Sequence, residues 1–302
     1  MRLGTRGSAL ALAQAQLVAD LLGGAELVTT AELSTGDAGE RRGGDKSRWV
    51  HGLEQALLGG EIDLAVHSAK DVPEELPEGL ALLGAPARAD AEDVLCGSST
   101  LDALPAGARV GTSSPRRTAQ LRAAREDIEL VPLAGNVDSR LRKLHERHDG
   151  LDAIALARAG LERLGRVEEV AAVLDPSRFV PAPGQGAIAL EGRVDDERAR
   201  AAAATITDAR ALTCLRAERA LSHALGSSCH TPIGAHAVLS GEGRLSLRAW
   251  VGLPDGSSWI ADALEGDAEA PQVLGDRLAA RMRAVGAAEM LRAAEEMAVG
   301  VG

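Results

Sequence analysis

The sequence predicts an α/β protein with two similar lobes, followed by a smaller α+β domain. Strand-like and helix-like runs alternate through the first half of the 302-residue chain, which is typical of a parallel or mixed sheet covered by helices. A short loop rich in glycine and hydroxyl residues joins a strand to a helix twice, at residues 4–8 and 111–114. From about Asp208 onward, a long helix, three strand-like runs and further helices follow one another, which indicates a separate domain.

The first lobe starts with an apolar strand at residues 3–5, after which Ser8 is placed to cap a helix that runs to Leu22. The same alternation continues with a strand at 26–33, a helix at 49–58 and a buried strand at 64–67.

The second lobe starts near Asp93 and repeats this plan. Its strands are expected at 109–112, 129–132 and 153–157, and its helices at 116–125 and 137–145. The hydroxyl-rich loop of each lobe leaves backbone N–H groups free to bind an anion at the positive end of the following helix. Two such loops in comparable positions predict two similar domains whose anion-binding loops face a common cleft.

Residues 181–186, Pro-Ala-Pro-Gly-Gln-Gly, are typical of a segment that crosses between domains. The last domain is expected to contain a helix ending at Leu225, strands at 233–239, 245–250 and 258–264, and helices to the end of the chain. Cys229 falls in the loop between the long helix and the first of these strands.

The composition excludes several functions. Aromatic residues make up 1% of the chain and the net charge is −11, so neither base stacking nor nonspecific binding to nucleic acid or an anionic membrane is expected. No apolar run of membrane-spanning length and no signal peptide is visible. An odd number of cysteines, three, without a secretion signal predicts free thiols in a reducing cytoplasm. Their lack of metal-ligand spacing predicts no bound metal.

Basic side chains follow several predicted strands, at the ends where open α/β sheets bind their ligands. They are Arg6, Lys70, Arg116, Arg117, Arg140, Arg142 and Arg163. Such a lining suits a ligand with several carboxylates, because arginine binds a carboxylate through two parallel hydrogen bonds. The alternative is that these side chains cover solvated helix faces, and for Arg142 that alternative is favoured.

Two residues in this region have more than one interpretation. Asp71 beside Lys70 is either a surface ion pair or a buried carboxylate that stabilises a developing cation, and spacing does not decide between them. His67 lies in an apolar strand, so a structural role is favoured over that of a base.

Cys229 is the cysteine with the most reactive setting. It lies in the loop sequence Gly-Ser-Ser-Cys-His-Thr-Pro, where the thiol is accessible and His230 can lower its pKa. Cys96 and Cys214 fall in apolar elements and are interpreted as packing residues.

Eight segments, in one order along nearly the whole chain, resemble the porphobilinogen deaminase (hydroxymethylbilane synthase) family. The longest read Asp-Leu-Ala-Val-His-Ser-Ala-Lys-Asp-Val-Pro at 63–73 and Val-Gly-Thr-Ser-Ser-Pro-Arg-Arg at 110–117. The others are residues 5–8 with Gln14, 135–141, 159–165, 183–187, 217–220 and 229–234.

The resemblance implies two lobes similar to periplasmic binding proteins around a cleft, and a C-terminal α+β domain that carries the cofactor cysteine. The expected boundaries are residues 1–86 with 187–204 for the first domain, 92–180 for the second and 208–302 for the third. The family implies a cytoplasmic monomeric transferase of haem biosynthesis. It joins four molecules of the small substrate porphobilinogen head to tail into hydroxymethylbilane, with loss of ammonia and without a nucleic-acid or membrane partner.

A dipyrromethane cofactor, made from the substrate and joined to Cys229 by a thioether, would prime this reaction. Each pyrrole carries two carboxylates, so a local cationic lining suits the product even in an acidic protein. Asp71, with Lys70 beside it, would stabilise the positive pyrrole and azafulvene species. The residues implied to bind the cofactor are Ser68, Lys70, Thr112, Ser113, Ser114, Arg116, Arg117 and Arg140. Those implied to bind the incoming substrate are Arg6, Ser8, Gln14, Lys46 and Arg163.

The chain departs from the family pattern at Ala134, since the family usually has arginine before the Gly-Asn pair. The loop at Lys46 reads Gly-Gly-Asp-Lys-Ser, whereas Gly-Gly-Lys-Gly is common. Two other functions therefore stay open: an impaired or non-catalytic relative that binds a tetrapyrrole or another polycarboxylate, and a small-molecule receptor. The receptor gives no role to Cys229, and production of hydroxymethylbilane separates the enzyme from the non-catalytic relative.

Overall fold

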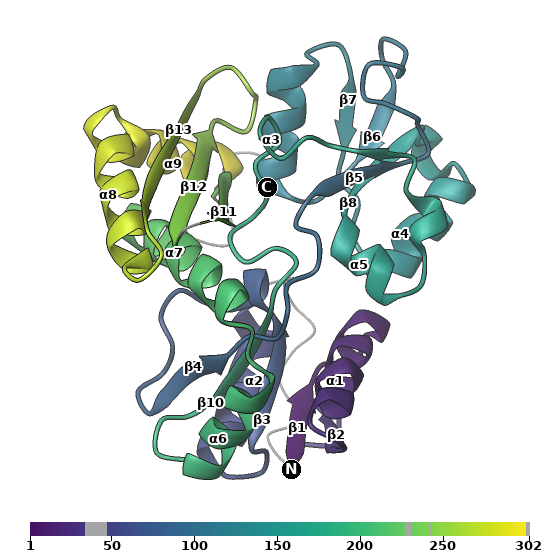
Figure 1. Ribbon diagram of the computed structural model, residues 1–302. Helices are drawn as coiled ribbons and strands as arrows, with labels where there is room; N and C mark the ends of the chain where they lie inside the picture. The colour runs from purple at the N-terminus through teal and green to yellow at the C-terminus, as the bar shows by residue number, and fades with distance from the viewer. Residues whose placement is uncertain (34–46, 227–230, 242, 300–302) are drawn as a thin grey trace. The chain divides into compact units, whose positions relative to one another are not determined.

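The computed structural model describes residues 1–33, 47–226, 231–241 and 243–299. It divides into two compact units, Met1–Ala89 with Gly186–Leu212 and Asp90–Gln185 with Thr213–Gly302. Each unit contains a mixed five-stranded sheet with helices, and the second unit also contains a three-stranded antiparallel sheet (Figure 1). The predicted α/β class, with two sheet-and-helix lobes and a C-terminal α+β part, is confirmed, whereas the three domain boundaries stay a prediction.

The sheet of the first unit has the strand order β2-β1-β3-β10-β4. Its strands are β1 (Arg2–Thr5), β2 (Glu26–Thr29), β3 (Leu64–Ser68), β4 (Leu80–Gly84) and β10 (Ile188–Arg193). The helices of this unit are α1 (Ala9–Leu21), the 3-10 helix η1 (Ala69–Asp71), α2 (Ser47–Leu58) and α6 (Glu197–Ile206). β1 is parallel to β2 and β3, so these strands end at one edge of the sheet, whereas β10 is antiparallel to β3 and β4.

The strand expected at 26–33 is shorter in the structure and ends at Thr29. The carboxylate of Glu32 accepts hydrogen bonds from the backbone N–H and the hydroxyl of Thr29, at 2.7 and 2.6 Å, and so closes a turn. β10 was not predicted, because it follows the crossing segment and is separated in sequence from the strands it pairs with.

The lobe of the second unit has the strand order β7-β6-β8-β5-β9. Its strands are β5 (Asp93–Cys96), β6 (Arg109–Gly111), β7 (Glu129–Val131), β8 (Ala153–Ala157) and β9 (Ala172–Val173). Its helices are α3 (Pro115–Ala124), α4 (Val137–His145), α5 (Arg158–Arg163) and the 3-10 helices η2 (His148–Gly150) and η3 (Val167–Glu169). β6 is parallel to β7 and β8, and β5 is antiparallel to β8 and β9, as in the first unit.

Two of the helices that open at the carboxyl edge of this sheet, α3 and α4, begin at a residue whose side chain caps the helix. Ser114 caps α3 by accepting from the backbone N–H of Arg117, with Pro115 at the first helical position. Asn136 caps α4 by accepting from the N–H of Ser139 at 2.9 Å. Gly135 before it has φ +118°, and a Cβ there would lie 2.2 Å from the Ser139 hydroxyl, so only glycine fits this turn.

The C-terminal part contains α7 (Ala209–Leu225), β11 (Ile233–Ser240), β12 (Arg244–Gly252), β13 (Trp259–Asp267), α8 (Pro271–Ala284) and α9 (Ala287–Val299). Apolar side chains of the three helices pack with those of β11 and β12 into one core that includes Leu221, Leu247 and Leu278. The predicted order of one helix, three strands and further helices is confirmed. Within the described residues, no helix combines the length and apolarity needed to cross a membrane.

Candidate functional site

Six predicted site residues gather at the carboxyl edge of the sheet in the first unit. They are Arg6, Ser8, Gln14, Ser68, Lys70 and Asp71. β1 and β3 are neighbouring parallel strands, so the loop after β1 and the 3-10 turn after β3 emerge at the same edge. The expectation that the cations of both lobes line one cleft, and the roles of these residues, stay predictions.

Side-chain hydrogen bonds cap the start of α1 and join this helix to the end of β3. The Ser8 hydroxyl caps α1 by accepting from the backbone N–H of Ala11 at 3.3 Å. Gln14, which is 2% exposed, donates from Nε2 to the hydroxyl of Ser68 at 2.9 Å and so links α1 to the end of β3. Lys70 and Asp71 are half-buried in the turn that follows.

A buried ionisable group lies behind this edge. His67 on β3 points its Nε2 to Glu191 Oε2 on β10 at 3.0 Å, and both side chains are almost fully buried. Glu54 of α2 is also buried, and burial, together with the charge of Glu191, raises the pKa of its carboxyl. The contact meets the distance of an ion pair but not the geometry of a hydrogen bond, so Glu191 is a charged neighbour of His67.

The remaining predicted side chains with described positions belong to the carboxyl edge of the second unit's lobe. Thr112, Ser113 and Ser114 follow β6, Arg140 lies on α4 after β7, and Arg163 ends α5 after β8. Arg163 is half-buried, and the loss of hydration lowers the pKa of its guanidinium to about 10. A cation in such surroundings favours an anionic ligand, because the anion restores the electrostatic stabilisation that water no longer provides.

Arg116 and Arg117 at the start of α3 are buried, with exposed fractions of 3% and 6%. Both pair with Asp93 of β5: Arg116 Nη1 lies 2.6 Å from Oδ2, and Arg117 Nη2 lies 2.8 Å from Oδ1. Burial alone raises the pKa of Asp93, but the two guanidinium groups outweigh it and hold that pKa well below its usual range. Since two cations face one carboxylate, this cluster keeps an excess positive charge.

Gln185 of the crossing segment completes the cluster. Its Nε2 donates to Asp93 Oδ1 at 2.8 Å and to the carbonyl of Ala91 at 2.6 Å. Its Oε1 accepts from Arg116 and Arg117, at 3.4 Å in each case. The segment at 181–186 therefore contributes a buried polar side chain to the site, besides crossing between units.

Sequence reasoning missed the roles of Asp93, Gln185 and Glu218. Glu218 of α7 is fully buried and accepts from the backbone N–H groups of Gly184 and Ala237, at 2.7 Å in each case. Nothing in the neighbouring sequence marks them: Asp93 follows Glu92, Gln185 lies between two glycines, and Glu218 precedes Arg219. Such residues need buried partners, which spacing alone does not identify.

Ala134, the position where the family pattern has arginine, is exposed at the turn before α4. Lys143 Nζ donates to the carbonyl of Ala134 at 3.2 Å, so an ammonium group reaches this turn from the last turn of the helix. Arg142 is exposed, in agreement with its interpretation as part of a solvated face.

Two predicted residues, Lys46 and Cys229, lie outside the described residues. Cys96 and Cys214 are described, and both are buried. Burial, with a contribution from Glu169, raises the pKa of the Cys96 thiol to about 12, which keeps it in the unreactive thiol form.

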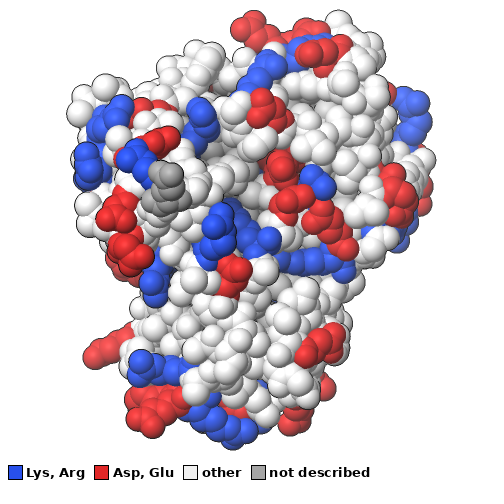
Figure 2. All heavy atoms as spheres, viewed as in Figure 1, with Lys and Arg blue, Asp and Glu red and all other residues white. Residues whose placement is uncertain are grey.

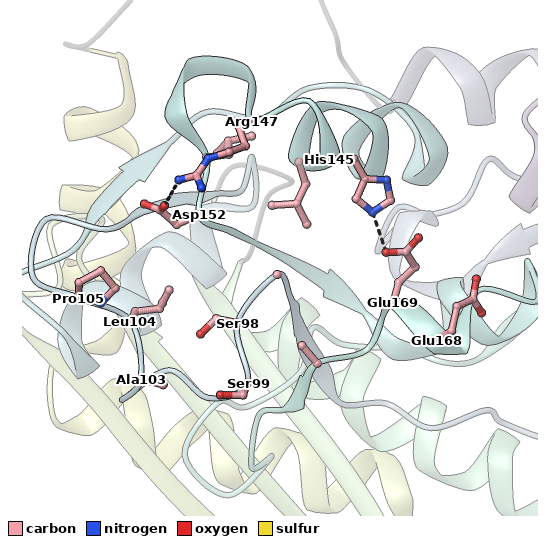
Figure 3. A pocket seen from close by; sticks show the side chains of 14 residues that line it. Ser98, Ser99, Ala103, Leu104, Pro105, His145, Arg147, Asp152, Glu168 and Glu169 are labelled. Atoms are coloured by element: carbon pink, nitrogen blue, oxygen red, sulfur yellow. Dashed lines mark hydrogen bonds and ion pairs between the residues drawn. The ribbon is translucent and has the colours of Figure 1, made fainter.

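A cavity of about 680 Å³ lies at the opposite edge of the second unit's lobe (Figure 3). Its lining includes Ser98, which follows β5, and Asp152, which precedes β8, and none of the predicted site residues. Four of its charged side chains form two pairs, Arg147 with Asp152 at 2.8 Å and His145 with Glu169 at 2.9 Å, and Glu168 pairs with Arg166 outside the lining at 3.3 Å. The cavity is therefore separate from the carboxyl edge that carries the predicted cations.

Charged groups of both signs are scattered over the face shown in Figure 2. On the face shown in Figure 2, acidic and basic side chains are interspersed, so the acidic excess of the chain does not produce a uniformly acidic surface. Within the described part of the chain, no group of three or more His, Cys, Asp or Glu side chains is arranged to hold a metal ion.

Comparison with known proteins gives consistent matches along the chain. The family model described as porphobilinogen deaminase, dipyromethane cofactor binding domain, matches residues 1–201, and that of the porphobilinogen deaminase C-terminal domain matches residues 212–284. A porphobilinogen deaminase of Xanthomonas oryzae is 46% identical over 97% of this chain and 99% of its own length. One of Deinococcus radiodurans is 42% identical over 97% of this chain and 98% of its own length.

Solved structures of lower similarity also match. A methionine binding protein, MetQ, is 14% identical with a TM-score of 0.42, over 68% of this chain and 89% of its own. An immunogenic lipoprotein A from Vibrio vulnificus is 13% identical with a TM-score of 0.41, over 70% of this chain and 97% of its own.

Proposed function

The chain belongs to the porphobilinogen deaminase family, and from this we propose that it joins four porphobilinogen molecules head to tail into hydroxymethylbilane, with release of ammonia. This is the reaction of a hydroxymethylbilane synthase in tetrapyrrole and haem biosynthesis. The observation that carries the proposal is the gathering of Arg6, Ser8, Gln14, Lys70 and Asp71 at one sheet edge. At that edge, Arg6 and Lys70 can bind the carboxylates of a ligand, and the carboxylate of Asp71 can face a positive charge on it.

The first unit's edge is proposed to bind the substrate and assist its activation. Arg6 and the start of α1 at Ser8 supply a cation and a helix N-terminus, both of which favour a carboxylate. Asp71 supplies a fixed negative charge for the positive charge that develops on the pyrrole as ammonia leaves. Lys70 beside it balances that charge while the site is empty and binds a carboxylate when a ligand enters.

The residues of the second unit fit the covalent dipyrromethane that the family's cofactor domain holds. The excess positive charge of the cluster around Asp93 and the desolvated guanidinium of Arg163 both favour a ligand with several carboxylates. We propose that Thr112–Ser114, Arg116, Arg117 and Arg140 hold those carboxylates and that Cys229 carries the cofactor. When bound, the cofactor supplies the end to which substrate units are joined.

The direct test is incubation of the purified chain with porphobilinogen, followed by detection of hydroxymethylbilane and released ammonia. We expect both products in proportion to one another. Binding of porphobilinogen without either product would instead identify the chain as a non-catalytic relative.

The cellular location and the oligomeric state of the chain are part of the same proposal. We expect it to act in the cytoplasm as a monomer. Sedimentation of the loaded protein should give a single species near the 31.1 kDa of the chain, and a concentration-dependent larger species would contradict this.

A further inference from the structure

Helix α3, which carries Arg116 and Arg117, packs against the C-terminal sheet on one face. Ala119, Arg122 and Ala123 are spaced by three and four residues and so share that face. Trp250 of β12, 5% exposed, packs with Ala119 and with Val180 of the segment that leads into the crossing. Arg122 Nη1 also donates to the carbonyl of Pro254, in the turn between β12 and β13, at 3.1 Å.

Three buried glycines set the distances in this contact. A Cβ on Gly256, in the same turn, would lie 2.6 Å from the backbone nitrogen of Ala123 and 2.7 Å from Arg122 Cβ. A Cβ on Gly234, in β11, would lie 2.6 Å from the carbonyl oxygen of Val180. A Cβ on Gly252 would lie 2.4 Å from the Trp250 ring, so the ring occupies the space beside this glycine. We call Gly234, Gly252, Gly256 and Trp250 the glycine seat.

Val180 connects this seat to the cationic cluster. Its carbonyl accepts from Arg116 Nη1 at 2.9 Å and from Gln120 Nε2 at 3.1 Å. The neighbouring carbonyl of Pro181 accepts from the N–H of Ala235 at 2.8 Å, which anchors β11 to the same segment. In sequence, β11 starts four residues after Cys229.

We propose that the glycine seat positions Arg116 and Arg117 for the cofactor by holding α3 and Val180 against the C-terminal sheet whose first strand follows Cys229. The inference rests on the proposed function, since it assigns these arginines to the cofactor that Cys229 carries. The seat acts through the arginines and touches no ligand itself, so its members are positioning residues. Close backbone approach suits this task because it leaves no side-chain rotamers through which the contact can relax.

The test compares Gly256→Ala with Gly243→Ala. Both glycines have positive φ, +75° and +73°, so alanine strains the backbone similarly at each. A Cβ on Gly243 meets nothing within 4 Å, whereas one on Gly256 meets α3 at 2.6 Å and must push it away to reach an ordinary contact of 3.4 Å or more. Only Gly256→Ala therefore moves the helix that carries the arginines.

Each substitution is made in the wild-type chain and in Cys229→Ser, which cannot hold the cofactor. The Tm is measured for these four proteins and for their two parents, the wild type and Cys229→Ser. We expect Gly256→Ala to lower the Tm of the loaded protein by about 2–4 °C more than that of Cys229→Ser, because the cofactor then gains less from the arginines. Gly243→Ala should lower both equally. The kcat of loaded Gly256→Ala should fall about tenfold. A misplacement of about 1 Å at the reacting groups costs on the order of 100-fold, and the effect here is smaller because the helix acts on the cofactor only through the arginines.

A second matched pair keeps the test decisive if Gly256→Ala does not fold. The Cβ introduced by Gly234→Ala would lie 2.6 Å from the carbonyl oxygen of Val180 and would push that segment away. The Cβ introduced by Gly241→Ala, also in the C-terminal part, would meet nothing within 4 Å. An equal loss of Tm in loaded and unloaded forms, with unchanged kcat, would overturn the proposal and leave the seat a packing contact. Wild-type protein that carries no mass increment on Cys229 would instead refute the proposed function.

Discussion

Asp71 and Asp93 are both carboxylates beside cations, but they lie in different surroundings. Asp93 is 1% exposed and lies between two buried guanidinium groups. Asp71 is half-buried, at the end of a 3-10 turn on the edge of a sheet. A carboxylate enclosed by the protein stabilises the fold, whereas one at a binding edge is placed to stabilise charge on a ligand.

Asp71→Asn keeps the shape of the side chain and removes its charge. We expect turnover to fall by about 100-fold or more, because a fixed charge beside a developing cation is lost, while the Tm stays within about 2 °C. Steady-state kinetics and thermal unfolding check this. Asp127→Asn, at an exposed ion pair with Arg125, is the control and should leave both unchanged. Near-wild-type turnover of Asp71→Asn would refute the catalytic role.

Ala134→Arg tests whether the missing cation limits this chain. A charge-assisted contact to a carboxylate is worth roughly 1.5–3 kcal/mol, so we expect kcat/KM to rise by about one to two powers of ten. Lys143 already brings an ammonium group to the carbonyl of residue 134, 3.2 Å away. If the Lys143 ammonium replaces the charge of the missing arginine, Lys143→Met should lower kcat/KM in the wild type. The same substitution should have little effect in Ala134→Arg. No change in either variant would show that this turn does not meet the substrate.

At the scale of elements, one ion cluster joins parts of the second unit that are far apart in sequence. Asp93 comes from β5 and the two arginines from α3, and Arg117 Nη1 also donates to Ala155 of β8 at 3.2 Å. Gln185 adds the crossing segment. The start of α3 is therefore held by strands and by the crossing segment together, besides its own cap.

Asp93→Asn should destabilise the protein by about 3–5 kcal/mol at neutral pH, because two buried cations lose their counter-charge. The pKa of Asp93 is depressed in the folded state, so its contribution is present above the ordinary pKa of about 4 and is lost as pH falls towards the depressed value. The difference in unfolding free energy between wild type and variant should therefore shrink below pH 4. Urea unfolding between pH 7 and pH 3 measures it, and a constant difference would contradict the assignment.

At the scale of the whole molecule, the two lobes share one plan: three parallel strands, an antiparallel fourth strand in the sheet order, and helices that open at the carboxyl edge. The C-terminal part has a different architecture and contains Cys229 in its sequence. Of the two cysteines with described positions, Cys96 is fully buried with a raised pKa and Cys214 is 7% exposed in α7. This distribution leaves Cys229 as the expected attachment point.

The intact mass of the purified wild-type protein should exceed that of the sequence by one dipyrromethane. Cys229→Ser should lose this increment, whereas Cys96→Ser and Cys214→Ser should keep it, because their thiols are enclosed in the core. Mass spectrometry of the three variants decides the matter. An adduct that persists in Cys229→Ser would rule out the assignment.

Much of the fold was predictable from local patterns. Ser8, Ser114 and Asn136 cap helices directly after strands, and capping depends on residues that are neighbours in sequence. That Arg6 and Lys70 follow strands at the same edge also depends on a general rule, because parallel neighbouring strands end at one edge of a sheet. The family motifs added the roles that spacing left open.

The order of the elements, the loops that precede the helices and the residue types at the strand ends can be inferred from the sequence alone. Which charges are neutralised within the protein depends on the folded structure. Arg116 and Arg117 meet Asp93 across a separation of more than twenty residues, and Val180 joins them to the glycine seat. The reason is that burial and partner choice depend on contacts between distant segments, whereas the patterns of strands, helices and caps are local.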